Sequence, residues 1–131
     1  MSKNIENSGI YVDARNMYKE LYSNAFYKMS KTDRILIGDR MLTMNERLIA
    51  DISMAYHITE DKQKYIEIAI AQFESLKEIL RLASELSIIS DSKTKLRIFE
   101  FIGRIDEGIY KWHTCANFSH YINSNKIIYS L

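Results

Sequence analysis

Basic side chains gather in two stretches of the sequence. Residues 15–47 carry seven Lys/Arg against four Asp/Glu, and residues 93–104 carry four against one, so each stretch has a net charge of +3. Residues 48–92 carry four against eight, and the whole chain of 131 residues has a net charge of only +1. Clustered Lys and Arg bind phosphate groups, because each neutralised phosphate releases counterions. The chemistry that this pattern favours is therefore the binding of a polyanion.

Nine basic residues are the candidate nucleic-acid contacts: Lys28, Lys31, Arg34, Arg40, Arg81, Lys93, Lys95, Arg97 and Arg104. The same charges also fit two other interpretations, a solvated surface and a contact with an acidic protein. Glu100 precedes Arg104 by four residues, and Glu107 precedes Lys111 by four. This order favours ion pairs along one helix and is typical of a solvent-exposed face.

No motif for catalysis or for a cofactor is recognisable in the sequence. A di-iron site in a helical bundle needs Glu-x-x-His pairs, and none of the ten glutamates has a histidine three residues on. His57 and His113 could meet near Glu60 and Asp61, but two histidines at helix ends are more often surface groups than metal ligands. A phosphate-binding glycine loop and a nucleophile motif are both absent. We expect a protein with no enzymatic activity, no cofactor and no metal.

Cysteine content and apolar runs indicate a compartment. Cys115 is the single cysteine, so an internal disulfide is excluded and a reducing environment is favoured. The sequence has no apolar run of membrane length, and the beginning MSKNIENSG lacks the apolar centre of a signal peptide. We expect a cytoplasmic protein without a membrane partner.

The scarcity of turn-forming residues predicts the fold class. The chain has no proline and only four glycines, too few for the turns of a sheet protein, so an all-α fold is predicted. Four helical segments are predicted, 10–24, 32–57, 60–86 and 93–116; apolar residues recur at steps of three and four in three of them and every seven residues in segment 32–57. Their short links favour an up-down-up-down antiparallel four-helix bundle over residues 10–116, with a flexible lead-in at 1–9 and a C-terminal tail at 117–131.

Helix starts are marked by polar residues. Ser30 is the predicted N-cap of the second helix, with Asp33 in its first turn, where the helix dipole favours negative charge. Thr59 is the predicted cap of the third helix, and Glu60 and Asp61 are expected in its first turn. Either Ser90 or Ser92 is the predicted cap of the fourth.

Apolar spacing predicts the core and raises the question of self-assembly. In segment 32–57 a heptad stripe begins with Ile35 and Leu42, and a second stripe from Ile37 to Ala55 makes the apolar face wider than one neighbour needs. Gly103 and Gly108 each cost about 1 kcal/mol relative to alanine, so close approach of another helix is expected there. Five aromatic residues at core spacings are predicted to pack rather than to stack on bases: Tyr18, Phe73, Phe99, Tyr110 and Trp112.

In such a bundle the second and fourth helices run parallel, so their basic first halves lie at the same end. The ends of the first and third helices add further lysines and an arginine there. We name this end the basic pole, with Lys19, Lys28, Lys31, Arg34, Arg40, Lys77, Arg81, Lys93, Lys95 and Arg97. Glu60, Asp61 and Glu67 lie towards the opposite end. A one-sided basic surface is typical of a protein that binds nucleic acid.

Three segments in this order give the sequence a family resemblance. LYSNAFYKMSKTDRILIGDRM at 21–41, ILRLASEL at 79–86 and IGRIDEGIYKW at 102–112 resemble the accessory variability determinant proteins of diversity-generating retroelements. These are four-helix bundles in one broad family with proteins encoded in intervening sequences of 23S ribosomal RNA genes. The resemblance covers residues 11–116. Its matching residues are Lys31, Asp33, Arg34, Gly38, Arg81, Arg104, Gly108 and Trp112.

The resemblance implies a function without catalysis. It implies a homo-oligomer, typically a pentamer, whose basic surface binds RNA or DNA and docks the element's reverse transcriptase during mutagenic cDNA synthesis. The alternative within the family is a structural bundle of the ribosomal intervening-sequence type that self-assembles without binding nucleic acid. The chain departs from the family in having Ser30 where proline is common, and its net charge of +1 is lower than that of most retroelement members.

Overall fold

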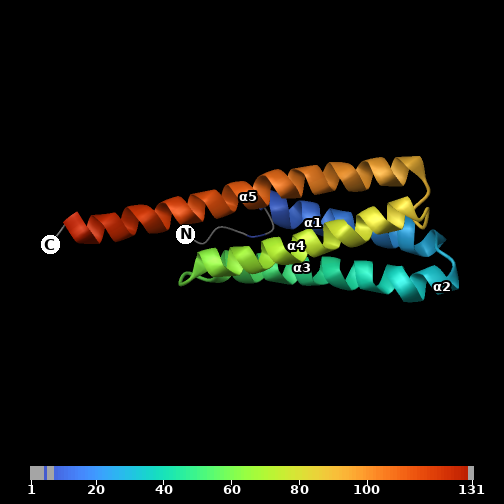
Figure 1. Cartoon of the computed structure of the whole chain (residues 1–131), viewed down its shortest axis with the longest axis horizontal. Helices are drawn as coiled ribbons and strands as arrows, with labels where there is room; N and C mark the ends of the chain where they lie inside the picture. The colour runs from blue at the N-terminus through green and yellow to red at the C-terminus, as the bar shows by residue number, and fades with distance from the viewer. Residues whose placement is uncertain (1–4, 6–7, 130–131) are drawn as a thin grey trace.

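The computed structural model describes residue 5 and residues 8–129, with side chains through residue 116. Most of the predicted lead-in at 1–9, and residues 130–131 of the predicted tail, lie outside the described residues. The protein is an all-α, up-down-up-down four-helix bundle, as predicted (Figure 1). Each helix packs against two neighbours: α1 lies between α3 and α5, and α4 lies between the same two helices.

The first two helices of the bundle each contain a π-helical turn. Helix α1 (Gly9–Glu20) continues through a π turn at Leu21–Ala25 and a 3-10 turn at Phe26–Lys28, so it runs past the predicted end at Asn24. After Met29 and Ser30, α2 (Lys31–Asp33), a π turn at Arg34–Gly38 and α3 (Asp39–His57) form one continuous helix. The two π turns lie on either side of the connection, at the end of the bundle where the basic pole is predicted.

The third and fourth helices are regular and long. Helix α4 spans Lys62–Glu85 and α5 spans Ser92–Tyr129 (Figure 1). The predicted end of the fourth helix at residue 116 is therefore wrong, since α5 continues for thirteen residues into the segment assigned to a tail. The sequence has no glycine after Gly108 and no proline, so it contains no strong helix breaker at the predicted boundary.

One of the predicted caps is confirmed and two are wrong. Ser30 Oγ accepts a hydrogen bond from the backbone N–H of Asp33 at 3.1 Å. The cap of α4 is Asp61 rather than Thr59; its backbone is left-handed (φ 53°), a conformation that aspartate tolerates better than threonine in so short a link. The cap of α5 is Asp91, whose Oδ2 accepts from the backbone N–H of Thr94 at 3.0 Å and from its hydroxyl at 2.6 Å.

The core confirms most of the apolar spacing. Side chains with no exposed surface come from all four helices, among them Met17, Leu48, Phe73 and Ile105. The second stripe of segment 32–57 lies inside the bundle, since Met41, Leu48, Ile52 and Ala55 are buried. Its width therefore serves two neighbours in the same chain, α1 and α4.

The first residue of the heptad stripe is not buried, contrary to the prediction. Ile35 keeps 60% of its surface exposed, although Leu42, seven residues later, is buried. The π turn at Arg34–Gly38 explains this difference, because a π turn has an extra residue and rotates the residues before it relative to those after it.

The glycines differ in their surroundings. A Cβ on Gly38 would lie 2.6 Å from Cδ2 of Phe26, so the missing side chain lets this ring rest on the second helix. On Gly108 it would lie 3.3 Å from Ile10, a tight approach of α1 that the sequence predicted. Around Gly103 nothing lies within 4 Å, so the same prediction is wrong for that glycine.

One polar side chain is fully buried between α1 and α3. Asn45 donates from Nδ2 to the backbone carbonyl of Ala14 at 3.1 Å, which fixes the two helices in register. Its Oδ1 has no hydrogen-bond partner within the described part of the chain.

Candidate nucleic-acid interface

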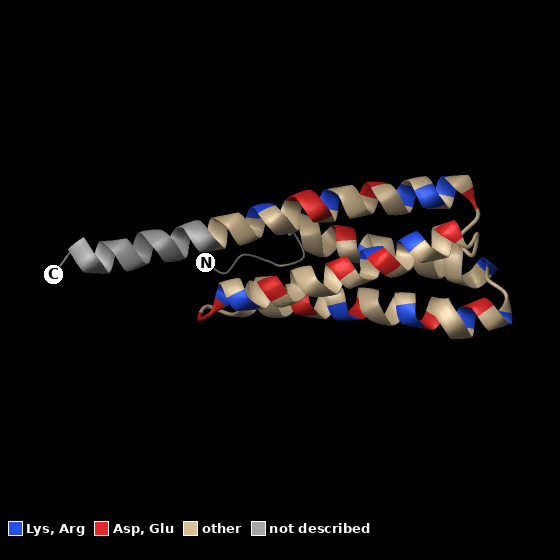
Figure 2. Cartoon of the chain, in the orientation of Figure 1, with Lys and Arg blue, Asp and Glu red and all other residues tan. Residues whose placement is uncertain are grey.

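The basic pole is built from four chain segments at one end of the bundle. The 3-10 turn before Met29, the start of α2, the end of α4 and the start of α5 all lie at this end (Figure 1). Asn24, Ala25 and Lys28 line a small hollow of about 30 Å³ together with residues 88–91 of the α4–α5 connection, so the two connections are neighbours. Figure 2 shows Lys and Arg on the first turns of α5 and around α2, interspersed with Asp and Glu.

Three of the nine candidate residues form ion pairs. Arg97 contacts Glu20 at 3.2 Å and Arg104 contacts Asp13 at 3.3 Å, and both pairs join α5 to α1. Arg81 contacts Glu78 one turn earlier in α4 at 3.0 Å. The ion pair of Arg104 is thus made with Asp13 rather than with Glu100, the partner that its spacing favoured. These three residues have part of their charge neutralised within the chain.

Arg34 is held by backbone carbonyls and aromatic rings. Its Nε donates to the carbonyl of Phe26 at 3.1 Å, and its Nη2 donates to the carbonyl of Tyr27. Its guanidinium carbon lies 5.4 Å from the ring centroid of Phe26 and 5.6 Å from that of Tyr27, within the range of cation–π contacts. Arg34 therefore satisfies carbonyls at the end of the first helix, a structural task that the sequence did not reveal.

The remaining five candidates have no ion pair recorded among the described residues. We name them the unpaired set: Lys28, Lys31, Arg40, Lys93 and Lys95. Four of them are exposed and Lys95 is half-exposed. Hydrogen bonds from Thr94 lower the pKa of Asp91, and the charges of Lys28 and Lys93 lower it further. The two lysines therefore come from different segments but share one electrostatic environment.

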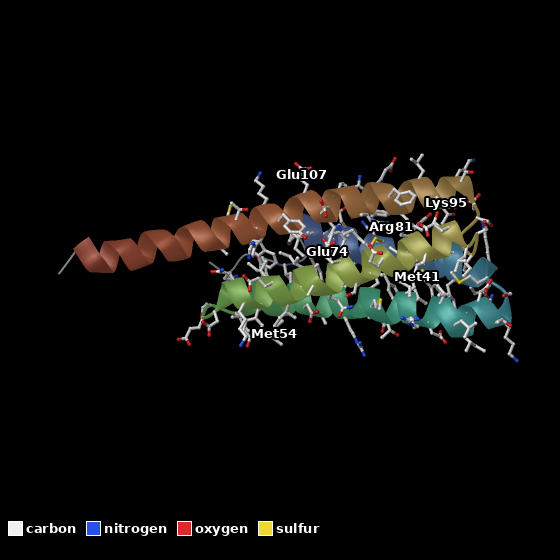
Figure 3. All side chains as sticks on the ribbon, viewed as in Figure 1. Met41, Met54, Glu74, Arg81, Lys95 and Glu107 are labelled. Carbon is white, nitrogen blue, oxygen red and sulfur yellow. The ribbon has the colours of Figure 1, made fainter. Side chains whose placement is uncertain are left out.

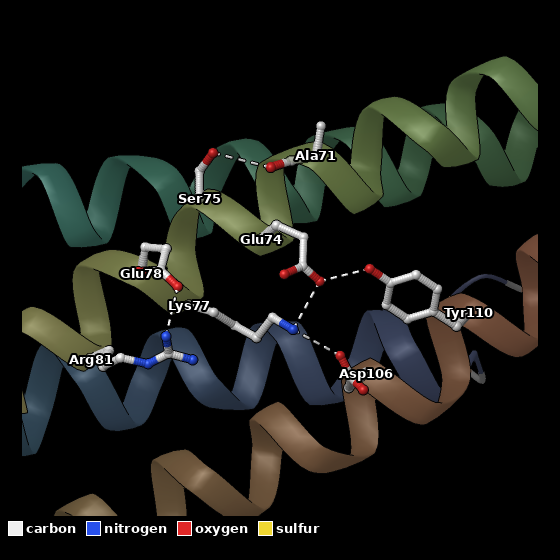
Figure 4. Close-up of polar contacts among 8 residues, drawn as sticks. All are labelled: Ala71, Glu74, Ser75, Lys77, Glu78, Arg81, Asp106 and Tyr110. Atoms are coloured by element: carbon white, nitrogen blue, oxygen red, sulfur yellow. Dashed lines mark hydrogen bonds and ion pairs between the residues drawn. The ribbon is translucent and has the colours of Figure 1, made fainter.

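Lys77, which the sequence assigned to the pole, lies in a charged network in the middle of the α4–α5 face (Figure 4). Its Nζ contacts Glu74 at 2.8 Å and Asp106 at 2.9 Å, and lies 4.8 Å from the ring centroid of Phe73. Glu74 also accepts a hydrogen bond from the hydroxyl of Tyr110 at 2.7 Å. Partial burial opposes the charge of Lys77, but the hydrogen bonds to Glu74 and Asp106 outweigh it and raise the pKa of the ammonium.

The two histidines considered as metal ligands contact groups on their own or neighbouring helices. His57 Nδ1 lies 2.8 Å from the carbonyl of Ser53, and His113 Nε2 lies 3.1 Å from Oε1 of Glu67. The contact with His113 is the main cause that lowers the pKa of Glu67. In the described part of the chain no group of three or more His, Cys, Asp or Glu side chains is arranged to hold a metal ion.

The aromatic residues divide differently from the prediction. Phe73 is buried, and Tyr18 and Trp112 pack against the core, as expected. Phe99 keeps 52% of its surface exposed and Tyr110 keeps 40%, so the core assignment of these two is wrong. Both lie on α5, which has the weakest separation of apolar and polar faces among the long helices.

Two exposed rings at the basic pole are not among the predicted site residues. Tyr22 and Tyr27 keep 47% and 66% of their surface exposed; Tyr22 lies in the π turn, and Tyr27 in the 3-10 turn that ends at Lys28. The signal in the sequence was the position of Phe26 and Tyr27 in a predicted connection, directly before Lys28, where no helical spacing assigns them to the core.

No family model matches the chain, no curated protein is significantly similar to it, and no solved structure gives a significant match. None of the helices within the described residues is long and apolar enough to cross a membrane.

Proposed function

We propose that the chain is a cytoplasmic, non-enzymatic accessory protein that binds RNA or DNA through the basic pole and supports a reverse transcriptase. The family resemblance motivates the reverse transcriptase and the role in a diversity-generating retroelement. The observation that carries the nucleic-acid part is the unpaired set. These five cations come from the 3-10 turn at Phe26–Lys28, α2, α3 and α5, and no acidic group of the described residues forms an ion pair with them.

The electrostatics favour phosphate over a solvated face. A solvated helical face normally pairs its charges at steps of three or four, as Arg81 and Glu78 do. The unpaired set instead presents cations to the solvent without a carboxylate at ion-pair distance, so the phosphates of a polyanion can neutralise them. Figure 3 shows Arg81 and Lys95 on the half of the bundle that holds the basic pole.

A salt titration of oligonucleotide binding tests this proposal. We expect binding at low salt to weaken on the order of 100-fold when Lys28, Lys31, Arg40, Lys93 and Lys95 all become alanine. We also expect log K to depend less steeply on log salt, by roughly 0.9 for each phosphate that the variant no longer neutralises. The control is Arg81→Ala with Arg104→Ala, which removes two paired cations and should weaken binding less for each charge removed. Absence of binding by the wild-type chain at low salt would refute the nucleic-acid part.

Self-assembly is the second candidate function, and exposed apolar residues near the same end favour it. Leu36, Leu86 and Leu96 keep 59%, 64% and 60% of their surface exposed. Large apolar side chains with this much exposed surface are candidates for contacts between subunits. Light scattering at micromolar concentration is the test: we expect an oligomer that Leu36→Glu and Leu86→Glu dissociate. A wild-type monomer would exclude both this candidate and the pentamer that the resemblance implies.

A further inference from the structure

Three aromatic rings form a cluster at the basic pole, and two of them are exposed. Tyr22 stacks on Phe26 with centroids 6.2 Å apart and planes 12° apart, and it meets Tyr27 edge to face with centroids 6.4 Å apart. Phe26 is half-buried, whereas Tyr22 and Tyr27 are exposed. We name these three residues the aromatic cluster. Tyr22 and Tyr27 stay exposed, although burying these two rings in the core would stabilise the fold.

The cluster is held in place by the second helix. Cδ2 of Phe26 lies 2.6 Å from the position that a Cβ on Gly38 would take, so the ring rests directly on that helix. The guanidinium of Arg34 lies over Phe26 and Tyr27 and donates hydrogen bonds to both carbonyls. Arg34 is therefore a positioning residue that fixes the rings, and Tyr27 remains 66% exposed despite this contact.

Two members of the unpaired set border the cluster in the chain. Lys28 follows Tyr27 directly, and Lys31 begins α2 only three residues later; both are exposed. Exposed rings beside unpaired cations are the combination that binds single-stranded nucleic acid, because bases stack on the rings while the cations contact the phosphates. In a duplex the bases already stack on one another, so their faces are not available to such rings.

Resting on the proposed nucleic-acid binding, we infer that the basic pole selects single-stranded RNA or DNA, with unpaired bases stacking on Tyr27 and Tyr22. The arrangement distinguishes the roles of the residues. Tyr22 and Tyr27 contact bases, Lys28 and Lys31 contact the backbone, and Arg34 holds the rings without contacting the ligand. The competing hypothesis is that a protein partner binds these rings, and such binding would not depend on nucleic-acid bases.

Fluorescence anisotropy with three labelled probes tests the inference on the full chain at low salt. The probes are an oligothymidylate, a duplex of the same length and a strand of the same length made of abasic units, which keeps the phosphates but has no bases. We expect the wild type to bind the oligothymidylate most tightly. Tyr27→Ala should weaken that binding about 5- to 150-fold, the range for removing one stacked ring, and leave the other two probes unchanged.

Matched variants separate stacking from charge and from damage to the fold. Tyr27→Phe keeps the ring and should bind the oligothymidylate within about twofold of the wild type, since stacking does not need the hydroxyl. Tyr22→Ala should repeat the selective loss, whereas Lys31→Ala should weaken the binding of all three probes. Tyr110→Ala, at an exposed ring outside the cluster, should leave all three unchanged.

The outcomes distinguish this inference from the proposed function. If the wild type binds none of the probes, the proposed function fails and the inference fails with it. If it binds the duplex and the abasic strand as tightly as the oligothymidylate, and Tyr27→Ala and Tyr22→Ala behave like the wild type, nucleic-acid binding stands and base stacking is refuted. The aromatic cluster would then be assigned to a protein contact.

Discussion

Lys77 and Lys31 have opposite surroundings. Lys77 lies in the middle of the α4–α5 face, and Lys31 lies at the basic pole. Lys77 is half-buried, contacts two carboxylates and lies over an aromatic ring. Lys31 is exposed and has no ion pair recorded among the described residues. The difference shows that the basic residues of this bundle have two kinds of surroundings. Lys77 joins two neighbouring helices, whereas the charge of Lys31 faces the solvent.

Aromatic and glycine residues follow the same division. In the middle of the bundle Phe73 is buried and supports the charged network, whereas at the pole Tyr22 and Tyr27 are exposed and supported by Arg34. A side chain on Gly38 at the pole would collide with the ring of Phe26, whereas Gly103 on α5 faces open space. The comparison predicts which substitutions change stability and which change binding.

The glycines give the largest expected change in stability. Gly38→Ala places a methyl group against Phe26 and should lower the free energy of unfolding by about 1–3 kcal/mol, since overpacking outweighs the gain in helix propensity. The matched control, Gly103→Ala, meets no atom within 4 Å and should raise stability by up to about 1 kcal/mol. Urea unfolding followed by circular dichroism measures both, and equal effects at the two sites would contradict the contrast.

The lysines give the next largest change. Lys77→Met leaves Glu74 and Asp106 without their shared cation and should cost roughly 1 kcal/mol, a value reduced by the partial exposure of both carboxylates. Lys31→Met removes an exposed charge without an ion pair and should change stability by less than about 0.5 kcal/mol. Denaturant midpoints of the two variants test this, and an effect of Lys31→Met as large as that of Lys77→Met would show that the pole is structural.

The pH dependence of stability gives the smallest change. The hydrogen bond from Lys77 is the main cause that lowers the pKa of Glu74 below its usual value of 4.5. A carboxyl with a lowered pKa in the folded state stabilises the protein above pH 4.5, and this contribution is lost as the pH falls through the folded pKa. We therefore expect Glu74→Gln to lose less stability than the wild type on acidification, by roughly a few tenths of a kcal/mol. The difference is small because solvent screens the partly exposed pair of Glu74 and Lys77.

Urea midpoints measured from neutral pH to below the pKa of Glu74 test this prediction. Glu100→Gln is the control, since Glu100 is exposed and has no ion pair recorded among the described residues. If the stability of Glu74→Gln falls with decreasing pH as steeply as that of the wild type, the network adds nothing to stability near this pH.

Local patterns predicted the fold well where one rule acted alone. The absence of proline and the spacing of the apolar residues predicted four antiparallel helices. The Ser30 cap was confirmed because capping depends on residues that are close together in the sequence, here Ser30 and Asp33. The core positions of α4 were correct for a similar reason. Ile66, Phe73 and Leu80 repeat every seven residues in a helix without an irregular turn, so the spacing applies over its whole length.

Predictions failed where contacts between helices or irregular turns decide the outcome. Ile35 is exposed because a π turn changes the helical register, and this turn has no simple signature in the residues. Arg34 and Lys77 looked like other basic residues of the pole, but one satisfies carbonyls of the preceding helix and the other contacts a carboxylate 29 residues away. Neither role can be derived from charge alone.

The sequence by itself determined the helical class, the antiparallel order and the collection of basic residues at one end, because periodicity, short links and composition act locally along the chain. Only the tertiary structure decided which of those cations stay unpaired and which rings stay exposed. Both depend on groups that lie far apart in the sequence, such as Arg97 with Glu20, 77 residues apart. Pairing and burial are properties of the packed helices, and the distances between side chains that fix them exist only after folding.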